Sequence, residues 1–537
     1  MPGALGRQDR RGPAPNAAAV DDSDGGGGQR VPDRGRGRGG VDRLPQFPGE
    51  VELGGGAGIH GQAVHRQPID QPLRRGNALH GIAPALGQGR REAGRQHGTE
   101  AEVGELGTHG TTLAGCTPIS RHVRTVLAGS RDVVAGPRRP GGLMPRDVHP
   151  FHAHATDADL DDLHARLAAA RLPEAETVHH ATPGPHRWEQ GVPLADLIDV
   201  VNYWRTQYNW RSFETRLNRI GQFRTTIDDL GIHFLHRRSP RADATPLILT
   251  HGWPDSIVRF LDAIDELADP TNADAPAFHV VVPSLPGFGY SDKPATTGWG
   301  TEKIAAAWVE LMDRLGYPRF AAHGGDWGGN ITTVLGGRFP QHVLGIHTTF
   351  AAAPPGLTTD GLTAVERRWV EETHDFWHGS PTRLRAAYAK QQATRPQTIG
   401  YSLVDSPIGL LAWILDKFAE WTDTHDSPFE TIPIDRILDN ITLYWLTRTG
   451  ASAARLYYES HNALDPELRV DIPTALTMYP RDTEKCPRPW AQQRYRHIIR
   501  WRTPETGGHF PSLEVPEYFV KDLQDGLAAV LAADRRG

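Results

Sequence analysis

The chain has 537 residues, which is long enough for more than one domain and for a large buried core. Its formal net charge of −6 comes from interspersed acidic and basic residues, so we expect no basic face for nucleic acid, and no run of about 18 apolar residues predicts a membrane-spanning helix. Cys116 and Cys486 are the only cysteines, which excludes a disulfide framework and a zinc site, so we expect a cytoplasmic protein without bound metal.

Residues 1–143 differ sharply in composition from the rest of the chain. They contain no Lys, Trp or Tyr and a single Phe, but 31 of the 58 glycines. So few large apolar side chains cannot offset the entropy that is lost when a chain becomes ordered. We interpret this stretch as a disordered or non-native N-terminal extension. Translation that begins at Met144 is the favoured explanation, and a disordered Gly/Arg/Pro-rich tail is the alternative.

After this extension the sequence predicts helices and strands. Thr156 is a suitable N-cap for an amphipathic helix over 157–172. A second helix is expected over 194–207, and residues 225–235 alternate between apolar and polar side chains like a strand. We assign residues 144–225 to an N-terminal region that forms a helical meander.

Short apolar runs then alternate with helical patterns such as that of residues 302–315. Buried runs of this kind are typical of parallel strands whose two faces are covered by helices. The predicted strands are residues 245–250, 279–283, 320–323 and 475–479. The sequence therefore predicts an α/β fold with a mostly parallel sheet.

One long segment interrupts this alternation. Residues 354–465 are rich in Trp and Tyr, have a helical pattern and show little sign of strands. We interpret them as a helical cap inserted into the α/β core. The first part of the core is then expected over residues 226–353 and the second part over residues 466–537.

Gly324-Gly325-Asp326-Trp327-Gly328 follows a predicted strand and precedes a predicted helix. This is the form of the nucleophile elbow of α/β-hydrolases, with Asp at the position where esterases carry Ser. A carboxylate is ionised at neutral pH, so it can attack a saturated carbon without a base and form an ester that water must hydrolyse. A glycine-rich turn in which the Asp caps a helix is the other interpretation of the motif alone.

Other candidate residues follow in the order that α/β-hydrolases use. The backbone N–H groups of Trp253, after an earlier strand, and Trp327, after the nucleophile, are expected to form the oxyanion hole. His509 precedes the final predicted helix and is the candidate base. Asp482 follows the strand at 475–479 and is the candidate acid that orients this His, with Glu484 as its competitor.

From about residue 146 to its end the chain resembles the microsomal-type epoxide hydrolases, including their N-terminal domain. The resemblance implies an α/β-hydrolase fold and the conversion of an epoxide and water to a vicinal diol without a cofactor. The membrane anchor of animal members is not recognisable, so the chain resembles the soluble bacterial type. The segments that carry the resemblance are NYWRTQYNWRSFETRLNRIGQF (202–223), HGWPDS (251–256), PSLPGFGYS (283–291), GGDWGG (324–329), DSPIGLLAWILDKF (405–418), YYE (457–459) and GGHFPSLE (507–514).

The resemblance also implies an acid for the epoxide oxygen. Members of the family hold this oxygen with two tyrosines of the cap, and by position these match Tyr388 and Tyr457, with Tyr401 and Tyr458 as alternatives. A phenol has a pKa of about 10, so it still carries its proton at neutral pH. The expected partner is a small-molecule epoxide, with no nucleic acid and no membrane, and a homodimer is one option for the assembly.

Two other functions are compatible with parts of this pattern. A haloalkane or haloacid dehalogenase shares the Asp nucleophile, the His and the ester, but it needs no proton donor for its leaving halide. A catalytically inactive α/β-hydrolase-fold protein could bind a ligand without turnover. The tyrosine pair and the N-terminal region argue against the dehalogenase, and the complete set of nucleophile, acid and His argues against the inactive protein.

Overall fold

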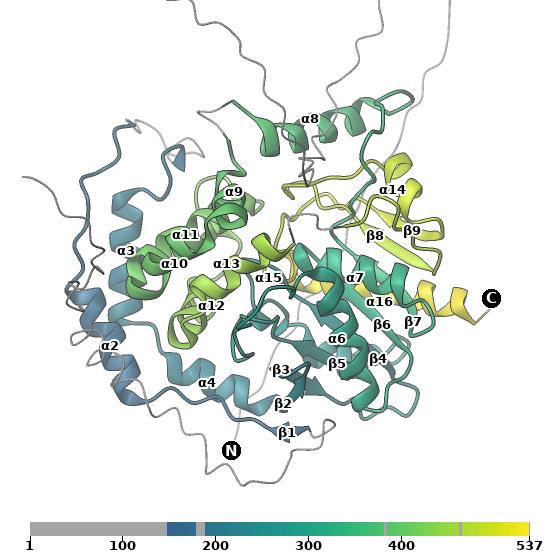
Figure 1. Ribbon diagram of the computed structural model, residues 1–537, viewed down its shortest axis with the longest axis horizontal. Helices are drawn as coiled ribbons and strands as arrows, with labels where there is room; N and C mark the ends of the chain where they lie inside the picture. Colours follow the sequence, from purple (N-terminus) through teal and green to yellow (C-terminus); the bar gives the residue numbers. More distant parts are fainter. Residues whose placement is uncertain (1–147, 179–187, 381–383, 461–463, 536–537) are drawn as a thin grey trace, which may run out of the picture. The chain divides into compact units, whose positions relative to one another are not determined.

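The computed structural model describes residues 148–178, 188–380, 384–460 and 464–535 (Figure 1). The predicted N-terminal extension at residues 1–143 lies outside this part of the chain. The strands are β1 (His149–Pro150), β2 (Gln222–Ile227), β3 (Leu230–Arg237), β4 (Thr245–Thr250), β5 (Phe278–Pro283), β6 (Phe320–Gly324), β7 (Val343–Thr348), β8 (Thr474–Thr477) and β9 (Ile498–Arg502).

Among the described residues, helices follow β4, β5, β6, β8 and β9 in turn, whereas three helices lie between β1 and β2 and one long helical stretch lies between β7 and β8. The helices are α2 (Asp157–Ala168), α3 (Leu194–Thr206), α4 (Trp210–Arg219), α5 (Ile264–Ala268), α6 (Thr301–Arg314), α7 (Trp327–Arg338), α8 (Ala364–His378), α9 (Ala387–Thr394), α10 (Pro396–Asp405), α11 (Pro407–Trp421), α12 (Ile434–Thr447), α13 (Gly450–Glu459), α14 (Arg488–Arg494), α15 (Pro511–Glu514) and α16 (Pro516–Asp534). Short 3-10 helices, η2 (Ile257–Phe260) and η3 (Pro428–Glu430), complete the set.

The strands of the described residues form one sheet in the order β1-β2-β3-β5-β4-β6-β7-β8-β9. Strands β5, β4, β6, β7, β8 and β9 run parallel to one another, whereas β1, β2 and β3 add an antiparallel edge that pairs with β5. The carboxyl ends of the parallel strands meet at one edge of the sheet, where α/β proteins usually place their sites. The expected mostly parallel sheet is confirmed.

Helices cover both faces of the sheet because successive strand side chains point to opposite sides. Val281 of β5 and Ile248 of β4 belong to a core that includes α6 and α7, while their neighbours Val280 and Leu247 belong to a second core with α5 and α16. All four side chains are completely buried. This two-sided burial explains why the parallel strands have continuous apolar sequences.

The prediction of a single strand over residues 225–235 is wrong. The structure has a hairpin there, in which β2 pairs antiparallel with β3. Asp228 and Asp229 form the turn, and both have a positive φ, 49° and 60°. Two successive residues with positive φ fit the tight turns that join paired strands, and Asp tolerates this conformation without the glycine that usually marks it in a sequence.

Helix α2 begins as expected but ends earlier. The Thr156 hydroxyl accepts a hydrogen bond from the Asp159 backbone N–H, and the Asp159 carboxylate accepts one from the Thr156 N–H, so the predicted N-cap is confirmed. The helix ends at Ala168 instead of Leu172, which is 40% exposed. Pro173 directly follows Leu172, and helical conformation is disfavoured for a residue that precedes proline.

The N-terminal region holds the helices between β7 and β8 against the core. The Trp204 indole N–H donates to Thr442 Oγ1 (2.9 Å), and the Tyr208 hydroxyl donates to Asp439 Oδ1 (2.8 Å). Both acceptors belong to α12, and burial raises the pKa of Asp439 to about 6 despite these polar contacts. Residues of the N-terminal region therefore hold α12 in place.

No single helix of the described residues has the length and apolar character to cross a bilayer. Only helices α10 and α11, which are bent by 116° at the break between them, reach that length and apolar character when the two are taken together.

Candidate active site

Asp326 stands at the turn between β6 and α7, with φ 54° and ψ −134°. A positive φ is a strained conformation for a residue with a side chain, and strain of this kind costs about 1–3 kcal/mol. The surroundings permit it because they are glycines: a Cβ on Gly328 would overlap the carbonyl oxygen of Thr250, and one on Gly252 would overlap the Asp326 carboxylate. The turn thus presents the carboxylate above the carboxyl ends of the strands.

Two backbone N–H groups point at one oxygen of this carboxylate. Asp326 Oδ1 accepts hydrogen bonds from the N–H of Trp253 (2.9 Å) and from the N–H of Trp327 (2.6 Å). These are the two donors expected from the sequence. Because both donors are part of the backbone, they remain in place when the charge on this oxygen changes, as an oxyanion hole requires.

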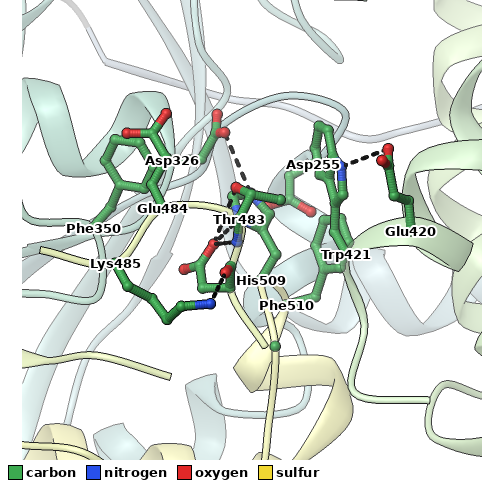
Figure 2. Close-up of polar contacts among 12 residues, drawn as sticks. Asp255, Asp326, Phe350, Glu420, Trp421, Thr483, Glu484, Lys485, His509 and Phe510 are labelled. Carbon is green, nitrogen blue, oxygen red and sulfur yellow. Dashed lines mark hydrogen bonds and ion pairs between the residues drawn. The ribbon is translucent and has the colours of Figure 1, made fainter. Parts of the chain in front are cut away.

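The second oxygen faces the candidate base. His509 Nε2 lies 3.3 Å from Asp326 Oδ2, and His509 Nδ1 lies 2.7 Å from Asp482 Oδ1 (Figure 2). Asp482 follows β8 and is 4% exposed, while His509 is 2% exposed. The imidazole is therefore held between two carboxylates from different parts of the chain.

Electrostatics favour a charged imidazole in this resting arrangement. Burial lowers the pKa of His509, but the carboxylates of Asp482 and Asp326 outweigh it and raise the pKa to about 10. Because Asp326 contributes to this rise, any reaction that neutralises its carboxylate lowers the affinity of His509 for its proton.

Glu484, the competitor for the acid position, lies elsewhere in the site. Its Oε1 accepts a hydrogen bond from the indole N–H of Trp377 on α8 (2.8 Å). The described contacts of the His509 ring include Asp482 and not Glu484. In this arrangement the acid next to the imidazole is Asp482.

The structure brings the two predicted tyrosines together over the nucleophile. Tyr388 of α9 stacks on the Trp253 ring with a centroid distance of 5.1 Å, and Tyr457 of α13 lies edge-on to the Trp327 ring at 4.8 Å. Burial and then nearby negative charge raise the pKa of both phenols well above the usual value, so both keep their protons. The alternatives Tyr401 and Tyr458 are 70% and 49% exposed.

Sequence reasoning missed a buried ion pair beneath the site. Arg259 and Asp255 are each 1% exposed and pair with one another. Arg259 Nη2 donates to the His509 backbone carbonyl (2.9 Å), and a Cβ on Gly325 would lie 2.9 Å from the same nitrogen. One guanidinium therefore contacts the oxyanion loop, the elbow and the loop that carries His509. The only sequence signal is the Asp–Arg spacing of four residues.

Helix α12 joins the oxyanion loop from the other side. Asn440 Nδ2 donates to the Pro254 carbonyl (2.8 Å), and the Tyr444 hydroxyl donates to the Asp255 carbonyl (2.7 Å). The Ser256 hydroxyl donates in turn to Asn440 Oδ1 (2.7 Å). These buried bonds hold the loop that positions the Trp253 N–H.

Among the described residues, no group of three or more His, Cys, Asp or Glu side chains could hold a metal ion.

Comparison with known proteins places this geometry in a family. Residues 148–260 match the family described as "Epoxide hydrolase N terminus", and residues 245–397 match the alpha/beta hydrolase fold. A relative from Stigmatella aurantiaca, named "Putative epoxide hydrolase", is 45% identical over 383 residues, which cover 70% of this chain and 84% of the relative. Epoxide hydrolase 1 of Sus scrofa is 32% identical over 419 residues, which cover 72% of this chain and 90% of the relative.

Solved structures agree with these relatives. The epoxide hydrolase of Aspergillus niger shares 32% identity with a TM-score of 0.64, covering 72% of this chain and 97% of that chain. The α/β-hydrolase fold and the family that the sequence motifs indicated are thus confirmed. The chain belongs to the epoxide hydrolase family, enzymes of the α/β-hydrolase fold that open epoxides with water.

Proposed function

We propose that this chain converts an epoxide to a vicinal diol through an ester on Asp326. The proposal is carried by the different contacts of the two carboxylate oxygens: Oδ1 accepts hydrogen bonds from two backbone N–H groups, and Oδ2 faces His509. An oxygen held by two donors is suited to become the carbonyl oxygen of an ester. The other oxygen, Oδ2, is then the nucleophile.

In the first half-reaction, Oδ2 forms a bond to one epoxide carbon and the bond from that carbon to the epoxide oxygen breaks. The electron pair of the broken bond moves to the oxygen, which takes a proton as it becomes a hydroxyl. Tyr388 and Tyr457 are the proposed donors, because their phenols keep their protons and both rings lie against the tryptophans of the oxyanion hole. The product is a hydroxyalkyl ester of Asp326.

In the second half-reaction, His509 removes a proton from water and the resulting hydroxide attacks the ester carbonyl. The charge that develops on Oδ1 is stabilised by the N–H groups of Trp253 and Trp327. The acyl C–O bond then breaks, the leaving oxygen that was Oδ2 takes the proton of the hydroxyl that had been added to the ester carbon, and the diol leaves as the carboxylate is restored. Asp482 keeps the imidazole oriented and stabilises its positive charge.

The pKa of His509 links the two steps. With Asp326 ionised, the pKa of His509 is raised to about 10, so the imidazole begins protonated. Ester formation removes the charge of Asp326 and lowers this pKa. His509 then releases its proton, which replaces the one that the tyrosine pair gave to the substrate oxygen, and becomes a neutral base for water.

The proposal can be tested by following oxygen in a single turnover with excess enzyme in H₂¹⁸O. We expect the first diol to be unlabelled and the label to enter the side chain of Asp326, as read from the mass of the peptide that contains it. Label in the first diol would show direct attack of water on the epoxide. Haloalkanes tested in parallel should release no halide, and halide without diol would assign a dehalogenase.

The tyrosine pair gives a further prediction. Replacing Tyr388 and Tyr457 together by Phe should slow ester formation by about 10²–10⁴-fold, because the epoxide oxygen loses its proton donors. Each single variant should lose less. The rate of the first half-reaction, measured by rapid quenching, should not decline on the alkaline side until well above pH 10, since the pKa of each phenol is raised well beyond that.

Tyr401→Phe is the matched control, because the Tyr401 side chain is 70% exposed. Its rate of ester formation should equal that of the unmodified enzyme. Equal rates for the Tyr388/Tyr457 double variant and the control would remove the pair from the proposed mechanism.

A further inference from the structure

Glu484 has no part in the mechanism above, although its carboxyl lies at the same site. Its charge would interact with those of Asp326, Asp482 and His509, and also with the phenol of Tyr388. In Figure 2 the carboxyl groups of Glu484 and Asp326 lie on the same side of His509. The side chain of Glu484 is only partly buried.

Hydrogen bonding leaves one oxygen of Glu484 unused. Oε1 accepts from the Trp377 indole (2.8 Å), and Oε2 has no partner among the described residues. The neighbouring cation does not neutralise it, because Lys485 Nζ pairs with Glu372 of α8 (2.8 Å). A carboxyl with no cationic partner, beside two further carboxylates, is better accommodated with its proton than without it.

The pKa of Glu484 agrees with this arrangement. Burial raises it first, repulsion from Asp482 adds to the effect, and the pKa reaches about 8. The group therefore carries its proton at neutral pH. With Oε1 accepting from Trp377, the proton is placed on Oε2, which makes this oxygen a hydrogen-bond donor. The titratable groups around it are Asp482 and Cys486 on its own loop, Asp326 at the elbow, His509, and Tyr388 on α9.

We propose that Glu484 binds the substrate through this donor and makes the site prefer epoxides whose substituent carries an oxygen acceptor, such as an ether or a carbonyl. The proposal rests on the function proposed above, because it assumes that the epoxide ring is bound at Asp326. Glu484 takes no part in bond making or breaking. It contacts the part of the substrate that extends toward α8 and sets specificity there.

The test uses two epoxides of nearly equal shape. 4-(Methoxymethyl)styrene oxide has an ether oxygen where 4-propylstyrene oxide has a methylene group, and the two undergo the same chemistry. The quantity measured is the ratio of their kcat/KM values for diol formation from pH 6 to pH 10. Because Asp326 and His509 act on both substrates alike, the pH dependence of the chemistry cancels in this ratio.

The unmodified enzyme should prefer the ether by about three- to tenfold below pH 8, as expected for one neutral hydrogen bond. The preference should fade as the pH rises through about 8, because the donor is lost when Glu484 ionises. Glu484→Gln should keep the preference and lose its pH dependence, since an amide donates at every pH. Glu484→Leu should lose the preference throughout.

Glu420→Gln is the matched control. Glu420 also accepts from an indole N–H, that of Trp421 (3.2 Å), but its carboxylate is paired with Lys417 and Arg385. Its variant should keep both the preference and the pH dependence. A Glu484→Gln enzyme that behaves like the unmodified one at every pH would overturn the proposal, as would an unchanged preference in Glu484→Leu.

A cationic substrate separates the proposed donor from an ionised carboxylate. 4-[(Trimethylammonio)methyl]styrene oxide should not be favoured by Glu484 at pH 7, and a strong preference that disappears in Glu484→Gln would overturn the donor role. These outcomes differ from failure of the proposed function itself. In that case neither neutral epoxide would give a diol with any of the enzymes.

Discussion

Asp326→Asn should form no ester and should lose turnover by about 10⁴-fold or more, as enzymes do when a nucleophile is removed. The amide oxygen is a neutral and much weaker nucleophile than a carboxylate. The variant keeps the shape of the side chain and an oxygen that can accept from the Trp253 and Trp327 N–H groups. We therefore expect the fold and substrate binding to survive while the chemistry stops.

The measurement is diol formation by freshly purified Asp326→Asn, together with its melting temperature. Fresh protein is needed because hydrolysis of the amide would regenerate Asp and restore activity slowly. A melting temperature close to that of the unmodified enzyme would show that the loss is chemical. Undiminished turnover from the first minutes would exclude Asp326 as the nucleophile.

His509→Gln should stop the reaction one step later. Attack by Asp326 does not need a base, so the ester should still form, but no group remains to take the proton from water. Loss of a general base typically costs about 10²–10⁴-fold. The protein should therefore accumulate as an adduct that is heavier by one substrate mass, visible by mass spectrometry of the intact chain.

The double variant Asp326→Asn/His509→Gln is the control, because an adduct on any other side chain would persist in it. We expect its mass to be unchanged after incubation with substrate. Steady turnover by His509→Gln would contradict the role of the imidazole. An inactive His509→Gln enzyme that never gains mass would contradict the ester route.

The parts of the site that could be predicted are those that depend on short sequence motifs and on their order along the chain. The elbow at Asp326 needs glycines at fixed positions around it, and the order of Asp326, Asp482 and His509 follows the order of the parallel strands. The oxyanion donors follow because one is adjacent to the nucleophile and the other ends a neighbouring strand. Each of these features can be predicted without knowing which distant residues come into contact.

The features that escaped prediction depend on contacts between distant segments. Arg259 reaches the carbonyl of a residue 250 positions away, and Trp377 reaches a carboxyl 107 positions away. Arg259 looks like an ordinary surface residue in a sequence, since charged side chains are seldom buried, and Glu484 was predicted only as a competitor of Asp482, without its contact to Trp377. The hairpin turn at Asp228 was missed for another reason, because its positive φ occurs without glycine.

Helix α12 is expected to stay in place during product release. If the helices that carry the tyrosines swung away from the sheet together with α12, the hydrogen bonds from Asn440 and Tyr444 to the Pro254 and Asp255 carbonyls would break. Each would leave a buried group unsatisfied, at about 1–3 kcal/mol, and the Trp253 N–H would lose its support. The diol is therefore expected to leave while α12 stays docked, so that the oxyanion hole is already assembled when the next epoxide arrives.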